Sequence, residues 1–359
     1  MRLPLGRTAV PRSAMIAAMN DKLPTDLSCI GQPAPSGEDA LIARYFAPLA
    51  KHPGALGLID DVAAITPPAG CELVLTADAV VGGIHFFPDD PPDTTARKAL
   101  RVNLSDLAAK GAKPLGFLLT LGLPRGVSET WLAAFSAGLG EDIAQFDCPL
   151  LGGDTVRTPD AAIISVAIVG SVPAGTMVKR SGARAGDRIV VTGTVGDAAL
   201  GLRLRQAEAE GWKLSAAQRA HLLQRYLVPQ PRSAAAEALR LHASGAMDVS
   251  DGLAGDLTKL CRASGVTARI DAAAVPLSDA ARAALAADPA LIETVLTGGD
   301  DYEVVAAVPP AKLAAFTAAA QAAGVAVTEI GDVTAGGAPP VFRWHGRQLE
   351  FARRSFSHF

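Results

Sequence analysis

The chain has 359 residues, 49% of them hydrophobic and 19% charged, which is enough to bury a large core and suits two domains better than one. Its 33 Lys and Arg residues are balanced by 36 Asp and Glu residues, and this balance argues against a nucleic-acid-binding protein, which needs a basic surface. No apolar run approaches the length of about 18 residues that a membrane-spanning helix needs, so we expect no membrane partner.

The first 36 residues differ in composition from the rest of the chain. They hold several arginines and prolines and no acidic residue before Asp21. A transit peptide has a similar composition, but proline and glycine break any amphipathic helix here. We therefore predict a disordered extension over residues 1–36, or a start codon assigned too early.

The cysteines are far apart in the sequence and form no Cys-x-x-Cys pair. They are Cys29, Cys71, Cys148 and Cys261. This spacing indicates free thiols in a reducing compartment rather than a zinc site or a set of disulfides. Together with the lack of a membrane segment, it predicts a cytoplasmic protein.

The predicted elements of the first half alternate between helices and strands. A helix should follow Ser36 and bury Tyr45 and Phe46, which recur at helical spacing. After it we expect a turn and short strand over 54–65, a strand over 73–81, a helix over 94–109, a strand over 115–123, a helix over 128–146, a Gly-Gly-Asp-Thr turn over 152–155 and a strand over 161–172.

The second half follows a break near residues 173–176 and shows the same alternation. We expect strands over 188–192, 247–249, 268–270, 304–308 and 325–330, and helices ending at Leu204 and spanning 234–242, 255–263 and 313–323. This pattern indicates an α+β or α/β fold, of which we predict α+β with two domains. We predict an N-terminal domain over 37–172 and a C-terminal α/β domain over 173–359.

Carboxylates occur where apolar elements meet turns. They are Asp60, Asp61, Asp78, Asp106, Asp154, Asp248 and Asp251. Taken singly, each has an ordinary structural explanation as a bulge, cap or turn residue. Together they suggest neutralisation by hard cations, because a buried carboxylate is costly and Mg²⁺ binds carboxylates together with substrate phosphates. The sequence therefore predicts a phosphate site with several Mg²⁺ ions.

Three further features bear on phosphate binding, and each has two interpretations. No Walker A motif is present, and the glycine-rich segment that begins at Gly193 is either a phosphate-binding turn or a plain strand-to-helix turn. His85 either packs as a neutral side chain or hydrogen-bonds an anionic substrate. Arg180 is either a surface charge or a phosphate clamp.

A series of motifs resembles the thiamine-monophosphate kinase family, whose superfamily includes aminoimidazole ribonucleotide synthetase and selenophosphate synthetase. In chain order they are G-E-D-A-L-I-A-R-Y-F, L-I-D-D-V-A-A-I, T-A-D-A-V-V-G-G-I-H-F, K-A-L-R-V-N-L-S-D-L-A-A-K-G-A, L-G-G-D-T-V-R, K-R-S-G-A-R-A-G-D, V-T-G-T-V-G-D-A-A-L-G-L, M-D-V-S-D-G-L and G-G-D-D-Y-E. They span about residues 37 to 303, and the last residues match more weakly.

The resemblance implies ATP-dependent phosphorylation of thiamine monophosphate to thiamine diphosphate, in thiamine diphosphate biosynthesis. It also implies a homodimer in which the N-terminal domains pair into a barrel-like sheet, with ATP and several Mg²⁺ ions between the domains. It implies direct in-line transfer without a covalent nucleophile, assisted by metal and by Asp106, Asp154 and Arg180.

The resemblance also implies roles for individual residues. The implied metal ligands are Asp60, Asp61, Thr76, Ala77 through its backbone, Asp78, Asp106, Asp154, Asp248 and Asp251. The implied nucleotide contacts are Gly153, Asp154, Arg180 and Ser250, and the implied contacts to thiamine monophosphate are His85, Asp300 and Phe356.

The sequence departs from the family pattern at three places. Ile59 replaces a glycine before Asp60, Asp300 replaces a glutamate, and the tail around Phe356 lacks an acidic residue. The alternatives are another ATP-dependent synthetase of the superfamily, such as a selenophosphate synthetase, which would need a reactive cysteine, or a non-catalytic nucleotide-binding dimer.

Overall fold

The computed structural model describes residues 37–209 and 211–355. Helix α2 (Gly37–Leu41) is described by itself. From Ile42 onward the chain forms one compact unit. It begins with the π-helical turn η3 (Ile42–Phe46), in which Tyr45 and Phe46 are buried as predicted, and the 3₁₀ helix η4 (Pro53–Leu58). No helix in the described ranges is long and apolar enough to cross a membrane.

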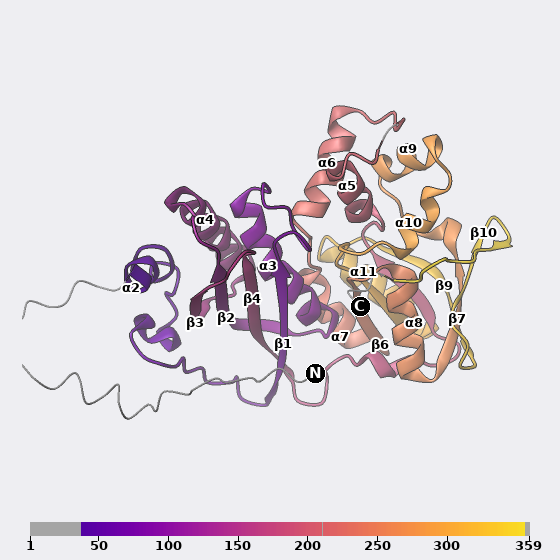
Figure 1. The fold of residues 1–359 in the computed structure, drawn as a ribbon. Coiled ribbons are helices and arrows are strands. Elements are labelled where there is room, and N and C mark those ends of the chain that lie inside the picture. The colour runs from indigo at the N-terminus through magenta and orange to yellow at the C-terminus, as the bar shows by residue number, and fades with distance from the viewer. Residues whose placement is uncertain (1–36, 210, 356–359) are drawn as a thin grey trace, which may run out of the picture. The chain divides into compact units, whose positions relative to one another are not determined.

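The first sheet, here called the N-terminal sheet, has four strands in the order β1-β4-β2-β3. They are β1 (Cys71–Val81), β2 (Lys113–Leu123), β3 (Leu150–Arg157) and β4 (Ile163–Pro173). Helix α3 (Pro92–Ala109) packs on this sheet, and α4 (Glu129–Phe146) packs on α3 (Figure 1). Ser128 caps α4 by accepting a hydrogen bond from the Trp131 amide, as its sequence predicts.

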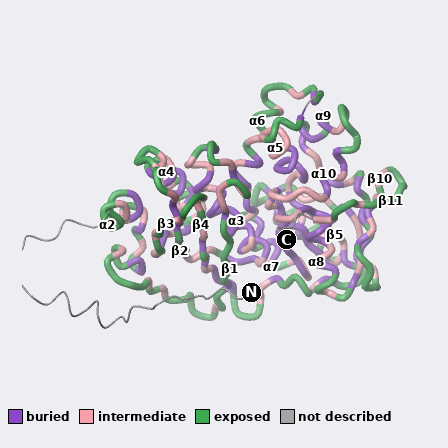
Figure 2. Tube along the Cα trace, viewed as in Figure 1, coloured by how far each residue is buried: buried purple, intermediate pink, exposed green. Residues whose placement is uncertain are grey.

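The face of the N-terminal sheet opposite α3 carries exposed apolar side chains; we call it the open face. Paired positions on neighbouring strands point to the same side of a sheet, and alternate positions point to opposite sides. Register therefore places five partly exposed side chains together on this face: Leu73, Leu75, Leu118, Val156 and Ile163. Leu75 is 67% exposed, and Figure 2 shows the exposed stretches along β1.

The second sheet, here called the C-terminal sheet, has the order β11-β10-β7-β9-β5-β8-β6. Its strands are β5 (Arg188–Thr192), β6 (Gly245–Val249), β7 (Val266–Asp271), β8 (Glu303–Val308), β9 (Val327–Ala335), β10 (Val341–Trp344) and β11 (Arg347–Gln348). The helices of this half are α5 (Asp197–Arg205), α6 (Ala216–Leu227), α7 (Ala236–His242), α8 (Leu253–Ser264), α9 (Asp279–Ala287), α10 (Leu291–Thr297) and α11 (Pro310–Ala322), with short 3₁₀ turns η5 (Arg180–Gly182), η6 (Ser233–Ala235) and η7 (Ala272–Ala274).

Apolar cores cover both faces of the C-terminal sheet. On β5, Ile189 and Val191 pack with the core that includes α8, whereas Val190 packs on the other side with α7 and α11. A strand buried on both faces reads as a continuous apolar run, which is why β5 was predicted with its observed bounds. Helix α3 contacts β6 and β8 as well as the N-terminal sheet, so one helix borders both sheets.

Two predicted elements are wrong. No strand forms over 54–65; Pro53 starts η4, and Leu56 and Leu58 adopt positive φ, which ends any regular structure there. Ile59 is 92% exposed, and the segment belongs to neither of the two described sheets.

The Gly-Gly-Asp-Thr segment is also not a turn. It lies within β3, which pairs parallel with β2. The register shifts between Phe117 and Leu118 on β2, and the Leu119 carbonyl lies where a Cβ on Gly153 would be. Glycine is therefore required here for close strand packing rather than for a turn.

Candidate active site

A carboxylate cluster lies where β1 meets α3. The Thr76 hydroxyl donates to Asp106 Oδ2 at 2.7 Å, which joins the two elements directly. The Asp78 amide donates to Asn103 Oδ1 at 2.9 Å, and Asn103 is anchored in turn through the Ala99 carbonyl. The strand places Thr76 and Asp78 on the α3 side of the sheet, because both are alternate positions of β1.

Two acidic residues from the C-terminal half complete this cluster. Asp248 lies on β6, and Asp251 lies in the loop before α8. Burial, together with repulsion from Asp106 and Asp251, raises the pKa of Asp78. Burial and the charges of Asp106, Asp256 and Asp78 raise the pKa of Asp248 well above its ordinary value, although Lys110 opposes this. The cluster therefore has an unbalanced negative charge that a cation would relieve.

One cavity of about 640 Å³ opens on one side of this cluster; we call it the His85 cavity. Its lining includes Asp78, His85, Ser250, Asp251 and Asp300, so it gathers five predicted site residues. The Val81 amide donates to His85 Nδ1 at 3.0 Å. The neutral imidazole therefore carries its proton on Nε2, which makes that nitrogen the donor.

The G-G-D-D-Y-E segment forms one wall of the His85 cavity, and its acidic residues have separate tasks. Asp300 binds Lys98 at 2.7 Å. Asp301 accepts hydrogen bonds from the amides of Gly196 and Ala198 at 2.6 and 3.2 Å, so it caps α5. Glu303 is buried and is bound by arginines of α6 and the following loop.

The glycine-rich turn at Gly193 is therefore a plain strand-to-helix turn. Helix N-termini attract anions through their free amides. Here the Asp301 carboxylate already holds these amides, so the position is not available for a phosphate.

A second cavity of about 510 Å³ lies on the other side of the Thr76–Asp106 pair; we call it the Arg180 cavity. It is lined by Lys110, Lys179 and Arg180 as well as by Thr76 and Asp106. Within the described residues, no carboxylate lies in ion-pair contact with Arg180 or Lys179. Burial lowers the pKa of Lys110, the only one of these cations that the cluster encloses deeply. Basic side chains without protein counter-ions suit a polyanionic ligand.

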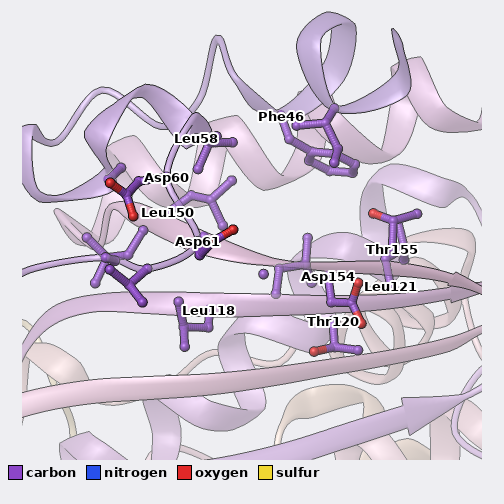
Figure 3. Close-up of a pocket in the computed structure, with 18 residues that line it drawn as sticks. Phe46, Leu58, Asp60, Asp61, Leu118, Thr120, Leu121, Leu150, Asp154 and Thr155 are labelled. Atoms are coloured by element: carbon purple, nitrogen blue, oxygen red, sulfur yellow. The ribbon is translucent and has the colours of Figure 1, made fainter. Parts of the chain in front are cut away.

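Four further predicted residues, Asp60, Asp61, Gly153 and Asp154, line a third cavity of about 660 Å³ on the open face of the N-terminal sheet; we call it the Asp154 cavity. Figure 3 shows Asp60 and Asp61 on the loop after η4, and Asp154 beside Thr120 on the strands below.

Strand register separates Asp154 from the carboxylate cluster within one chain. Asp154 is in register with Thr120, Ser165 and Ala79, whose side chains face away from α3. Asp78 lies on the opposite face and three strands away, which corresponds to about 14 Å at the usual strand spacing. The side chain of Ala77 also points to the open face. The site residues expected from the sequence thus fall into two groups.

The cluster fits Mg²⁺ by its chemistry. Thr76, Asp78, Asp106, Asp248 and Asp251 offer oxygen ligands, and their mutual repulsion favours a divalent cation. Among the residues that the structure describes, no three His, Cys, Asp or Glu side chains converge on one point. A cation would therefore need water and phosphate oxygens to complete its coordination, which is the usual behaviour of Mg²⁺. Asp251 is meanwhile paired with Lys259.

The sequence analysis did not identify the lysines at this site. Lys98 lies on α3 and Lys110 is its C-cap residue, with Val102 and Asp106 between them at intervals of four residues, so each member of this series neighbours the next on the helix surface. The sequence did contain a signal for these lysines, because charged residues recur at helical spacing in a helix whose other residues are mostly apolar. Phe356, predicted to stack on the substrate, lies outside the described residues.

Comparisons with known proteins identify the family of the chain. The family described as AIR synthase related protein, N-terminal domain, matches residues 59–172, and its C-terminal counterpart matches residues 184–342. The thiamine-monophosphate kinase of Caulobacter vibrioides is 43% identical over 332 residues, which cover 90% of this chain and 92% of that protein.

Solved structures give the same result. The thiamine-monophosphate kinase from Stenotrophomonas maltophilia matches with a TM-score of 0.73 and 38% identity, covering 81% of this chain and 91% of that one. AaThiL complexed with AMPPCP and TMP matches with a TM-score of 0.71 and 30% identity, covering 82% and 89%. The chain therefore belongs to the thiamine-monophosphate kinase family of the AIR synthase-related superfamily.

Proposed function

We propose that the chain transfers the γ-phosphoryl group of ATP to thiamine monophosphate, which yields thiamine diphosphate and ADP. Family membership supports this reaction. The observation in the fold that carries it is the position of the carboxylate cluster between two cavities. One cavity is basic and suits the phosphates of a nucleotide, and the other gathers His85 and Asp300 and suits the acceptor.

The transfer needs no protein nucleophile. A phosphate oxygen of thiamine monophosphate attacks the γ-phosphorus, and the bond from that phosphorus to the β–γ bridging oxygen breaks, which leaves ADP with the electron pair. The attacking oxygen is already largely ionised at neutral pH, so a strong base is unnecessary. The main obstacle is repulsion between two polyanions, and the protein has to position them and neutralise their charge.

We assign several Mg²⁺ ions to the carboxylate cluster, where Thr76, Asp78, Asp106, Asp248 and Asp251 would hold them together with water and phosphate oxygens. Bound there, Mg²⁺ neutralises phosphate charge and fixes phosphate oxygens. Arg180 and Lys110 bind phosphate oxygens from the basic side, and Ser250 contributes a hydroxyl from the His85 cavity. His85 and Asp300 hold the acceptor.

We further propose that two copies pair through the open face, with domains over 37–172 and 173–359. In the described N-terminal sheet β1 and β3 are the edge strands, and the open face is apolar. Exposed apolar patches and unpaired edges are both liabilities in a monomer. Two such sheets can close into an eight-stranded barrel, which buries the open face and leaves no edges.

Such a barrel would also unite the two groups of site residues. A two-fold axis parallel to the barrel joins β1 of one chain to β3 of the other, and this places the partner's strand that carries Asp154 beside the strand that carries Thr76 and Asp78. The partner's Asp61 would follow, because η4 packs on β3. We therefore propose that each complete site takes Asp60, Asp61, Gly153 and Asp154 from the second copy.

A coupled assay tests the reaction. Purified protein with ATP, Mg²⁺ and thiamine monophosphate should form thiamine diphosphate and ADP in equal amounts, and thiamine and aminoimidazole precursors should give no product. Absence of turnover in this assay would favour the non-catalytic nucleotide-binding dimer. Rapid-quench labelling with γ-labelled ATP should find no protein-bound phosphate, and a labelled protein would contradict direct transfer.

The cysteines argue against a selenophosphate synthetase. Burial raises the pKa of Cys148 to about 12 and that of Cys261 to about 11, so neither forms a thiolate readily at neutral pH. None of Cys71, Cys148 and Cys261 lines the His85 or Arg180 cavity, and Cys29 lies outside the described residues.

A charge on the open face should break the dimer. Leu75→Glu would place a carboxylate in the closed barrel, where an unpaired charge is strongly unfavourable. We expect the dissociation constant of the dimer to rise at least about 100-fold, with loss of activity at low protein concentration. Light scattering measures the mass, and Leu241→Glu, at an exposed leucine of α7, is the matched control. A fully dimeric Leu75→Glu protein would show that the open face is not the interface.

A further inference from the structure

We infer that Lys98 is a positioning residue for the acceptor, acting through Asp300; this inference rests on the proposed role of Asp300 in substrate binding. The Lys98 side chain is only 3% exposed although it carries a charge. Its ammonium donates to Asp300 Oδ2 at 2.7 Å and to the His85 carbonyl at 2.9 Å. It also lies 4.2 Å from the centre of the Tyr226 ring.

These partners come from three separate parts of the chain. His85 belongs to the loop after β1, Asp300 to the loop between α10 and β8, and Tyr226 to α6. A buried ammonium is stable only where its donors find acceptors. Here a carboxylate, a carbonyl and an aromatic face supply them, so the lysine holds both walls of the His85 cavity at a fixed separation.

The loop that carries Asp300 needs such a contact. Asp300 and Tyr302 adopt φ values of 72° and 50°, in the left-handed region that side chains other than glycine rarely occupy. Backbone of this kind persists only where the surroundings enforce it. The neighbouring Asp301 is fixed by the amides at the start of α5, and Lys98 fixes the side chain of Asp300 itself.

The contact also determines which part of Asp300 faces the acceptor. Lys98 holds Oδ2, and among the described residues no hydrogen bond is made to Oδ1. Asp300 lines the His85 cavity, and its side chain is 26% exposed. The remaining oxygen is thus an oriented acceptor for an N–H group of the substrate. The ammonium of Lys98 thus places a positive charge directly against the Asp300 carboxylate, at the edge of the acidic cluster.

The test separates a positioning role from a merely structural one. Lys98→Met, Asp300→Asn, the double variant and Arg97→Met, a control at the adjacent position of α3 that pairs with Asp142, are compared by steady-state kinetics and thermal melts. We expect Lys98→Met to raise the KM for thiamine monophosphate at least about tenfold and the KM for ATP less than about twofold. Because Lys98 acts through Asp300, the double variant should be no worse than Asp300→Asn alone.

Each of the other outcomes refutes either the role of Lys98 or the assignment of Asp300. If Asp300→Asn raises the KM for thiamine monophosphate and Lys98→Met does not, the role of Lys98 is refuted while the proposed site stands. If Asp300→Asn leaves that KM unchanged, the assignment of Asp300 in the proposed site is wrong and the role of Lys98 falls with it. Equal increases in both KM values with a lower Tm would mean that Lys98 is only structural. Lys98→Gln gives the same readout if Lys98→Met does not fold.

Discussion

Replacing Asp106 by Asn should lower kcat at least about 10²–10³-fold, the scale of losing one preorganised charge-stabilising group at a reacting centre. Asp106 lines the Arg180 cavity, on the side of the cluster opposite the His85 cavity, and its Oδ2 accepts a hydrogen bond from the Thr76 hydroxyl at 2.7 Å. Asparagine keeps the shape and one oxygen but removes the charge that would bind Mg²⁺. The fold should be preserved, because the variant relieves repulsion on Asp78 and Asp248 rather than breaking an ion pair.

The matched control is Asp93→Asn, in the first turn of the same helix and away from both cavities. It should retain kcat within about twofold, since a first-turn acid contributes only to helix stability. Activity is measured over a Mg²⁺ titration, beside a thermal melt of each variant. Near-normal activity of Asp106→Asn at saturating Mg²⁺ would contradict the assignment of metal to this cluster.

Elements with a strong local pattern could be predicted from the sequence. Helix α3 combines apolar positions at helical spacing with Gly111 just after its last residue, where φ is 72°. The prediction of 94–109 is therefore within two residues of the observed Pro92–Ala109. Strand β5 is buried on both faces of the sheet, so its sequence is a continuous apolar run that predicts a strand without knowledge of its neighbours.

Elements that depend on distant contacts could not be predicted. The Gly-Gly-Asp-Thr segment has the composition of a turn, but pairing with β2 makes it a strand. The segment after Pro53 has strand-like residues, but it pairs with no strand of the two sheets in the described part of the chain. Helices α9 and α10 and strands β10 and β11 were not predicted.

The same limit applies to the candidate site. The sequence identified the carboxylates by their residue type, but the register of four strands decides which face each one occupies. Only that register separates Asp154 from Asp78. Lys98 was missed because its place in the site follows only from its contact with Asp300, which lies 202 residues further along the chain.

A mixed dimer of Asp78→Asn and Asp154→Asn chains should recover activity that neither variant has alone. If each site takes Asp78 from one chain and the partner's Asp154, both homodimers have two defective sites. In the heterodimer one site receives both altered residues and the other receives both native ones. The heterodimer should therefore show about half of the wild-type kcat per dimer, as one intact site of two requires.

The experiment uses two affinity tags, so that only heterodimers are assayed after tandem purification. Asp154 is exposed and Asp78 lies at the cavity wall, so neither substitution should impair folding.

The control pairs Asp78→Asn with Asp106→Asn, whose positions lie on the same side of the sheet in one chain. That heterodimer has a defect in each site and should stay inactive. If the Asp78→Asn and Asp154→Asn heterodimer is equally inactive, each chain supplies its own ligands, and the closing of the barrel through β1 and the partner's β3 is wrong. Recovery in the first pair and not in the second would require the two carboxylates to meet across the dimer.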